Sequence, residues 1–364
     1  MRKRVTVILV IFLWLGLTVF AWFVPSKTLS QAERRPLAQM PKISADNLLN
    51  GSFMGKFEEY TLDQFPMRDT FRSLKSLFCY YVLQMGDNNG IYMADGYAGK
   101  LEYPLNPVSI SHALKKFNAI YEQYLQNTDS KIYMTIVPDK GYYLAAANGY
   151  PAMDYETLFA NMAEGMPWAQ IVDITKDLDI TDYYRTDTHW RQENLLKVAQ
   201  TLCDALGVTP PKAESFTRVL ATQQFHGVYY GQAALPMAAE ELYILENDLL
   251  SACRVYNHET GAYGTVYDMA KLTGSDSYEV YLSGAQALLT IENPNATTQR
   301  ELIVFRDSFA SSLVPLLIED YKTVTMVDIR YVQSAMLEKF VPFHGQDVLF
   351  AYSTLLLNSS STLK

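Results

Sequence analysis

The chain has 364 residues, of which 49% are hydrophobic and 19% are charged, and its formal net charge is −9. This length and composition are typical of a globular protein with one large domain or two modest ones. The acidic balance argues against a nucleic-acid partner, because phosphate binding needs a basic face. Cys79, Cys203 and Cys253 form neither an even disulfide framework nor a paired Cys/His spacing, so no structural zinc is expected.

The N-terminus carries the clearest local signal. Arg2, Lys3 and Arg4 are basic, and residues 5–24 form an apolar run without a charge. Twenty residues at about 1.5 Å each span a hydrocarbon core of roughly 30 Å. A cleaved signal peptide is the alternative, but no small-x-small cleavage site follows the run. We therefore predict a single-pass cell-membrane anchor at residues 1–24, with its basic end in the cytoplasm and the body outside.

A tether is predicted at residues 25–50, because prolines punctuate it and it has little periodicity. An amphipathic helix follows over residues 69–83, with Phe71 and Leu74 on its apolar side. A short hairpin is then predicted, pairing residues 91–93 with residues 101–103 around a turn. A second helix is predicted over residues 109–126.

Strands and helices alternate in the rest of the body. The predicted order is strand 131–138, helix 155–163, strand 171–174, helix 192–206 ended by Gly207, strand 302–305, helix after Ser308, strand 324–329, helix 332–340 and strand 348–352. This alternation predicts an α/β fold whose sheet is mostly parallel and carries helices on both faces. We expect one domain over residues 51–355, with a β-rich insertion around residues 208–300 and a polar tail at residues 356–364.

Three residues could form a catalytic site. Asp187 and His189 lie two apart, so in an extended segment they would share one face. A carboxylate beside an imidazole can fix the tautomer of the ring and raise its basicity, as a general base requires. Ser308 lies where a buried strand runs into a turn, and open α/β sheets place their sites at such strand ends. The sequence therefore suggests a Ser308/His189/Asp187 triad.

Each residue also has a simpler interpretation. His189 could be a structural histidine or, with Asp187, part of a metal pair, although the other histidines show no ligand-type spacing. Ser308 could do no more than cap the helix that follows it.

These motifs resemble the DHHW family of Gram-positive bacteria, which is related to the SGNH-like proteins that O-acetylate alginate in the periplasm. The resemblance covers nearly the whole chain after the anchor. It rests on residues 186–190 (TDTHW) and 306–309 (RDSF), and on residues 58–69, 137–140, 225–230 and 327–331.

The resemblance implies an SGNH-like three-layer α/β/α sandwich, with the acid and the histidine before the serine. Ser308 would be the nucleophile that carries an acyl group, His189 its general base and Asp187 the residue that orients His189. Arg306 and Tyr230 lie in matching motifs and are expected to contribute to the substrate or oxyanion site.

Two positions depart from the family pattern. Thr188 stands where the family name has its second histidine. Residues 281–286 stand where a Gly-Asn pair is expected, so Gln286 or backbone N–H groups would have to hold the oxyanion.

The function implied is an O-acetyltransferase or acetylesterase that acts on a cell-surface polysaccharide outside the cytoplasm and needs no cofactor. A multi-spanning membrane acyltransferase would supply the acyl group. The rival from another class is a non-catalytic glycan-binding or assembly protein on the same fold. A reactive serine would distinguish the first from the second.

Overall fold

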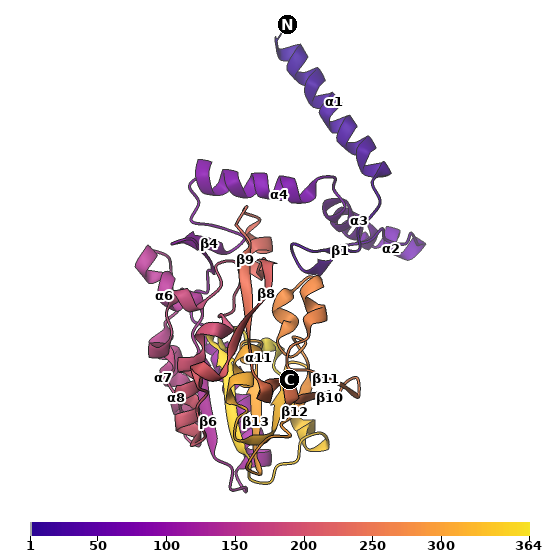
Figure 1. Ribbon diagram of the computed structural model, residues 1–364. Coiled ribbons are helices and arrows are strands. Elements are labelled where there is room, and N and C mark those ends of the chain that lie inside the picture. Colours follow the sequence, from indigo (N-terminus) through magenta and orange to yellow (C-terminus); the bar gives the residue numbers. More distant parts are fainter. Residues whose placement is uncertain (1) are drawn as a thin grey trace. The chain divides into compact units, whose positions relative to one another are not determined.

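The computed structural model describes residues 2–364, and the chain divides into two compact units (Figure 1). The first unit contains the chain up to Asn89 together with Tyr230–Pro236, and the second contains Gly90–Tyr229 and Met237–Lys364. The short helix α9 (Val228–Ala233) contains the junction between them.

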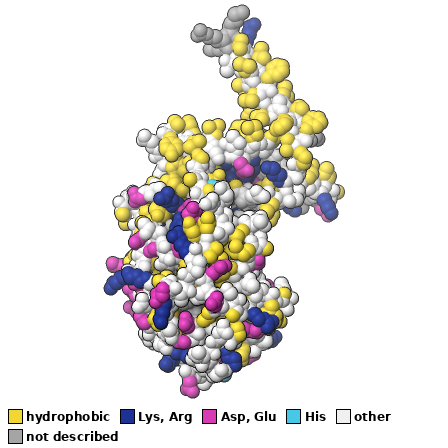
Figure 2. All heavy atoms as spheres, viewed as in Figure 1, with side chains coloured by type: hydrophobic (Ala, Val, Ile, Leu, Met, Phe, Trp, Pro, Cys, Tyr) yellow, Lys and Arg dark blue, Asp and Glu magenta, His cyan; other side chains and the backbone are white. Residues whose placement is uncertain are grey.

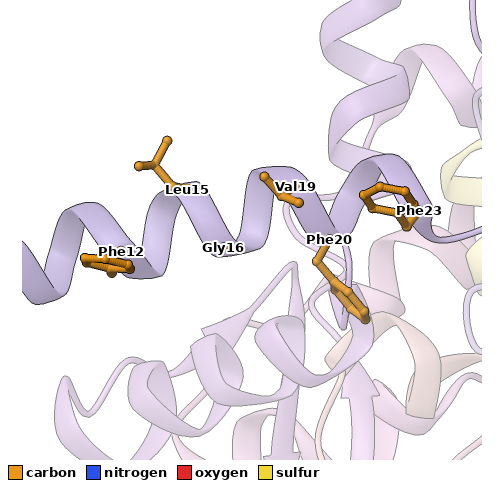
Figure 3. Close-up of a pocket in the computed structure, with 6 residues that line it drawn as sticks. All are labelled: Phe12, Leu15, Gly16, Val19, Phe20 and Phe23. Carbon is orange, nitrogen blue, oxygen red and sulfur yellow. The ribbon is translucent and has the colours of Figure 1, made fainter.

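The first unit begins with α1 (Arg2–Phe23), which confirms the predicted apolar helix. Its segment Arg4–Ala21 has a mean hydropathy of 2.3, so by length and composition the helix could cross a membrane. No part of this segment is buried against the protein. Figure 3 shows apolar side chains on a stretch of α1, with Phe12 and Phe20 one turn to either side of Gly16. An apolar surface of this kind is suited to lipid rather than to water.

The rest of the first unit is made of short elements. They are β1 (Leu29–Ser30), β2 (Arg35–Pro36), α2 (Ala45–Leu49), α3 (Ser52–Asp63), α4 (Arg68–Leu77), the π-helical turn η1 (Phe78–Val82) and β3 (Asp87–Asn88). The predicted amphipathic helix at residues 69–83 is thus confirmed as α4 continued by η1.

An ion-pair network joins the β1–β2 hairpin to α3 and α4. Arg35 contacts both oxygens of Asp63 at 2.8 and 2.6 Å, and Arg68 contacts Glu33 at 2.5 Å. The hydrogen bond from Arg35 lowers the pKa of Asp63 to about 2, although partial burial opposes the shift. The motif at residues 58–69 therefore has a structural role that its sequence did not reveal.

We expect this network to weaken in acid. A carboxyl group whose pKa is lowered by folding stabilises the folded state above its unfolded pKa, here 3.8, and this contribution is lost as the pH falls toward about 2. Hydrogen exchange of the β1–β2 hairpin, corrected for its intrinsic pH dependence, should therefore accelerate between about pH 4 and pH 2. The same experiment on Asp63→Asn should show faster exchange at neutral pH and a weaker pH dependence. Unchanged protection in that variant would exclude a stabilising role for the pair.

The second unit contains a sheet of eight strands in the order β11-β10-β12-β14-β13-β15-β6-β7. Five of them, from β14 to β7, are mutually parallel, and β12, β10 and β11 extend the sheet by antiparallel pairing. The strands are β6 (Ile132–Val137), β7 (Gln170–Ile171), β10 (Arg254–Asn257), β11 (Ala262–Gly264), β12 (Leu288–Glu292), β13 (Arg300–Arg306), β14 (Tyr321–Val327) and β15 (Asp347–Ser353). The predicted α/β fold with a mostly parallel sheet is confirmed.

Both faces of this sheet are covered. Successive side chains of a strand point to opposite faces. Val304 accordingly packs in one apolar cluster with α8 (Leu196–Leu206), whereas Phe305 packs in another with α5 (Pro107–Ile120) and α7 (Tyr155–Gly165). Each such buried side chain contributes roughly 1.5–3 kcal/mol relative to an exposed one. The central strands therefore form a rigid support for the loops at their carboxyl ends.

The remaining elements of the second unit are short. They are β4 (Ile91–Ala94), β5 (Tyr97–Lys100), α6 (Lys140–Leu144), β8 (Thr217–Phe225), β9 (Glu240–Glu246), α10 (Asp248–Ala252), α11 (Ala310–Leu313) and α12 (Thr354–Asn358). Strands β8 and β9 pair antiparallel in a ribbon of their own.

Three predicted elements are wrong in detail, and one of them is the strand expected at residues 171–174, which is only the two-residue β7. The hairpin is tighter than expected, because β4 pairs with residues 97–100 and not with residues 101–103. The helix expected at residues 332–340 is only a 3₁₀ segment, Ser334–Lys339. Leu337 and Val341 lie in the same apolar cluster, so burial of these two side chains produced the apolar pattern without a full α-helix.

Candidate active site

Ser308 lies in the turn between β13 and α11. The carboxylate of Asp307 holds this turn, because it accepts the backbone N–H of Phe309 at 3.1 Å and that of Ser353 at 2.8 Å. Ser353 ends the adjacent strand β15, so the turn is tied to the carboxyl edge of the sheet. Phe309 is the N-cap of α11, and its side chain makes no capping hydrogen bond. The Ser308 hydroxyl contacts His189 instead, which does not favour the helix-cap interpretation.

His189 and Asp187 lie in a tight loop, and the extended segment expected from the sequence is wrong. The loop is closed by a bridge between Tyr183 and Trp190 and by a hydrogen bond from the Tyr184 N–H to the His189 carbonyl at 3.1 Å. The Asp187 carboxylate turns back within the loop and accepts the backbone N–H of His189 at 3.0 Å. A local turn therefore produces the side-chain contact that an extended strand was expected to give.

The structure brings the three predicted residues together. Nδ1 of His189 lies 2.5 Å from Oδ1 of Asp187, and Nε2 of His189 lies 2.8 Å from Oγ of Ser308. Asp187 is fully buried, His189 is nearly so and Ser308 is half-buried. A buried carboxylate on Nδ1 favours the tautomer whose Nε2 accepts the serine proton. The catalytic roles of these residues remain predictions.

The second oxygen of Asp187 is held by the segment that follows β8. Oδ2 accepts the backbone N–H of Val228 at 2.8 Å, and the neighbouring N–H of Gly227 donates to Oγ1 of Thr186 at 2.9 Å. A β-carbon placed on Gly227 would lie 2.2 Å from the α- and β-carbons of Asp187. The backbone of Gly227 is thus packed directly on Asp187, and this explains the glycine in the motif at residues 225–230.

The imidazole of His189 lies between two aromatic rings. Its plane stacks on Tyr278, with ring centroids 3.9 Å apart, and the ring of Phe309 lies 4.9 Å away. Tyr278 is anchored in turn by its hydroxyl, which is 2.8 Å from Oγ of Ser312. Trp190 donates from Nε1 to the Phe309 carbonyl at 3.0 Å. These contacts restrict rotation of the imidazole and of the serine turn together.

Lys140 supports the loop from inside the protein. It is 2% exposed, and its ammonium group donates to the carbonyls of Tyr184 and Arg185 at 2.9 and 3.3 Å. Burial lowers the pKa of Lys140 to about 7, against the opposing charges of Asp187 and Glu240. The motif at residues 137–140, whose role was not apparent from sequence alone, therefore holds the loop that carries the acid and the histidine.

Glu240 fixes the same loop from β9. Its carboxylate accepts the backbone N–H groups of Arg185 and Thr186, both at 2.8 Å, and it pairs with Arg191 at 2.8 Å. No local pattern pointed to Glu240, because the loop that it holds lies more than 50 positions away in the chain.

Arg306 lies under the serine turn and is fully buried. It donates to the carbonyl of Gln286 at 3.2 Å and to Oγ of Ser311 at 3.2 Å, while its Nε has no partner among the described residues. Burial lowers the pKa of this guanidinium. The arrangement indicates support of the two neighbouring loops rather than contact with a substrate.

Gln286, one of the other two predicted residues, bonds to residues other than Ser308. The amide oxygen of Gln286 accepts a hydrogen bond from Asn257 at 2.7 Å, and its amide nitrogen donates to the Ser283 carbonyl at 2.9 Å. Both ends of the amide are therefore bonded to neighbouring loop and strand residues. Its oxyanion role stays a prediction that these contacts do not favour. Tyr230 belongs to the first compact unit, and its part in the site also stays a prediction.

Ser308 opens onto a cleft of about 660 Å³. Its walls come largely from residues 353–364, which contain α12 and a 3₁₀ turn (Ser360–Thr362) and were not indicated by the sequence. The cleft is lined by Thr188, Asp307, Ser308, Phe309, Arg330, Tyr331, Ser353, Leu355, Leu356, Ser359, Ser361, Thr362 and Lys364. Within residues 2–364, no group of three or more His, Cys, Asp or Glu side chains is placed to hold a metal ion.

The fold and the site together define an α/β protein that carries a serine–histidine–aspartate series at the edge of its sheet. A serine, a histidine and a buried aspartate are hydrogen-bonded in series at the carboxyl edge of a mostly parallel α/β sheet. The family described as DHHW protein matches residues 118–327, which is more than half of the chain. The chain belongs to the DHHW family.

Two of the solved structures that match the chain share its fold at low sequence identity. A DHHW family protein from Eubacterium siraeum aligns with 74% of this chain and 93% of its own, with a TM-score of 0.61 and 20% identity. Bacillus cereus PatB1 aligns with 73% of this chain and 97% of its own in a structure with a sulfonyl adduct, with a TM-score of 0.58 and 18% identity. The O-acetyltransferase domain of Pseudomonas putida AlgJ covers 74% of this chain and 92% of its own, with a TM-score of 0.44 and 15% identity. No protein with a curated description matches the chain.

Proposed function

We propose that this protein transfers acetyl groups to a cell-surface polysaccharide, or removes them from it, through an acyl-enzyme on Ser308. The observation that carries the proposal is the series of contacts from Asp187 through His189 to Ser308, at 2.5 and 2.8 Å, beside an open cleft. A serine hydroxyl is a weak nucleophile by itself, and a hydrogen-bonded imidazole with an orienting carboxylate is the usual means of activating it.

In the first step, Oγ of Ser308 attacks the carbonyl carbon of an acetyl ester while Nε2 of His189 takes the hydroxyl proton. The resulting imidazolium is stabilised by Asp187, whose charge is held by the N–H groups of His189 and Val228. Collapse of the tetrahedral intermediate breaks the ester bond, and the imidazolium returns the proton to the leaving alcohol. As the oxyanion donor we propose the backbone N–H of Ser308 itself, because the Phe309 N–H is used by Asp307.

In the second step, a hydroxyl of the acceptor attacks the acetyl-serine and His189 takes its proton; the bond between the acetyl carbon and Oγ of Ser308 then breaks, and the imidazolium returns the proton to Oγ. A sugar hydroxyl gives transfer, whereas water gives hydrolysis. The hydroxyl groups of Ser359, Ser361 and Thr362 along the cleft suit an acceptor that is itself rich in hydroxyl groups. We therefore place the acceptor saccharide in this cleft.

The setting of the reaction is part of the same proposal. The helix α1 would anchor the protein, and the basic residues in its first turn would keep the N-terminus in the cytoplasm and the body outside. Residues 25–50 would tether an SGNH-like three-layer body. A multi-spanning membrane acyltransferase would deliver the acyl group to this side of the membrane, because an acetyl donor made in the cytoplasm has to cross the bilayer.

The proposal is tested with the full-length protein in detergent. 4-Nitrophenyl acetate is the acyl donor, and short oligosaccharides are the acceptors. We expect slow release of 4-nitrophenol, an acetyl group on Ser308 in the acid-quenched protein, and acetylated oligosaccharide by mass spectrometry. Because PatB1 was solved with a sulfonyl adduct, a sulfonyl fluoride is a suitable probe, and it should modify Ser308 and stop the release.

The two classes of function give different results in this experiment. Oligosaccharide binding by protein that neither turns over the ester nor forms a sulfonyl adduct would overturn the catalytic proposal. The non-catalytic glycan-binding or assembly protein would then be the better description.

A further inference from the structure

The helix formed by α4 and η1 exposes its apolar side instead of burying it. Five apolar residues of this helix are between 42% and 73% exposed. They are Phe71, Leu74, Phe78, Tyr81 and Val82, and the first four follow one another at intervals of three or four residues. This spacing places those four on one face of the helix. Figure 2 shows hydrophobic atoms gathered over this part of the molecule.

The polar side of the same helix is held against the first unit. Arg72 donates to the Gly231 carbonyl at 2.7 Å, and the buried Ser76 hydroxyl donates to the Ala233 carbonyl at 2.6 Å. Arg72 also lies 3.3 Å from Glu33. Rotating the helix to bury its apolar face would break these bonds and leave buried polar groups without partners. The outward orientation is therefore built into the unit.

Lipid is the surface that this face fits. The helix has an apolar stripe, a polar and basic opposite side, and an exposed Lys75 beside the stripe, as in helices that lie in the headgroup region of a bilayer. Tyr81, at the far end of the stripe, is 73% exposed and has the amphipathic character favoured at that depth. In addition, the compact unit that contains α4 also contains α1, the helix suited to span the membrane. Attachment through α1 would keep the stripe at a high effective concentration near lipid, so even weak insertion would be populated.

We propose that the α4–η1 helix is a second membrane-binding element, which lies in the bilayer surface with the exposed apolar side chains of residues 71–82 facing the acyl chains. Two attachments would restrain the first unit at the membrane, whereas α1 alone leaves it free to swivel. This inference does not depend on the chemistry proposed for Ser308.

The test places a nitroxide spin label on each side of the helix in the full-length protein. Leu74→Cys carries the label on the apolar face, and Asp69→Cys is the matched control, because Asp69 is also exposed but lies outside the stripe. The native cysteines are buried, and wild-type protein taken through the labelling corrects for any reaction at them. Both proteins are placed in vesicles of phosphatidylcholine and phosphatidylglycerol.

Collisions with oxygen and with a water-soluble nickel chelate then report the surroundings of each label. At Leu74 we expect the ratio of oxygen to nickel collisions to be several times that at Asp69, because oxygen concentrates in lipid and the chelate stays in water. In detergent-free buffer with an amphipathic polymer in place of the vesicles, this difference should shrink. Equal, water-like ratios at the two sites in vesicles would overturn the proposal and would leave the stripe as a surface for a protein partner.

Discussion

Ser308→Ala should reduce ester turnover by at least about 10³-fold, to the background of the uncatalysed reaction. The substitution removes the Ser308 hydroxyl, which lies 2.8 Å from Nε2 of His189, and leaves the turn itself held by Asp307. His189→Ala should have nearly the same effect, because the hydroxyl is then left without a base. The measurement is the steady-state release of 4-nitrophenol by full-length protein, with circular dichroism to show that each variant is folded.

The double variant Ser308→Ala/His189→Ala is more informative than either single variant. If Ser308 and His189 act as one unit, the double variant should be little slower than Ser308→Ala, since the losses are not additive. Ser215→Ala, in a 3₁₀ turn of the same unit, is the matched control and should keep wild-type turnover. A folded Ser308→Ala with wild-type turnover would show that this serine is not the nucleophile.

Gly227→Ala should reduce turnover by about 100-fold, because Gly227 is packed directly on Asp187. The added methyl group would lie 2.2 Å from the α- and β-carbons of Asp187. Neither carbon can move away without moving the backbone of the loop. The displacement would break the 2.8 Å hydrogen bond from Val228 to Asp187 and move the carboxylate away from His189. Overpacking of this kind also costs about 1–3 kcal/mol of stability, so the melting temperature should fall as well.

Gly264→Ala is the matched control for this prediction. Gly264 lies on the exposed edge strand β11, and the nearest atom to a new β-carbon would be 4.0 Å away. This variant should therefore be close to wild type in turnover and in melting temperature. Were Gly227→Ala equally silent, the close packing on Asp187 would have no functional consequence.

Asp187→Asn tests the role of the carboxylate without adding a methyl group. It is therefore informative even where Gly227→Ala does not accumulate as folded protein. The amide has nearly the shape of the carboxylate but cannot stabilise the imidazolium. It should thus reduce turnover, yet leave more activity than Ser308→Ala, because the aspartate orients the base and does not react.

Much of the central sheet was evident from the sequence, because its strands are buried on both faces and therefore read as unbroken apolar runs. β6, β13 and β15 are examples in which nearly every residue is buried. The helix at residues 332–340 was misjudged because two buried side chains, Leu337 in the 3₁₀ segment and Val341 just after it, imitate helical spacing. A periodic pattern reports which side chains are buried, and it does not by itself distinguish the backbone that buries them.

The sequence by itself determined which residues are the candidates for chemistry. A serine at a strand end and an Asp-x-His pair can be recognised locally, since each depends on neighbours in the chain. Only the tertiary structure decided that these pieces meet, because Ser308 and His189 are 119 positions apart. It also decided which groups hold them, including Glu240, Lys140 and Gly227, and that the chain's last residues line the cleft. The physical reason is that hydrogen bonds and close packing between distant segments depend on three-dimensional position, and a local sequence pattern carries no record of it.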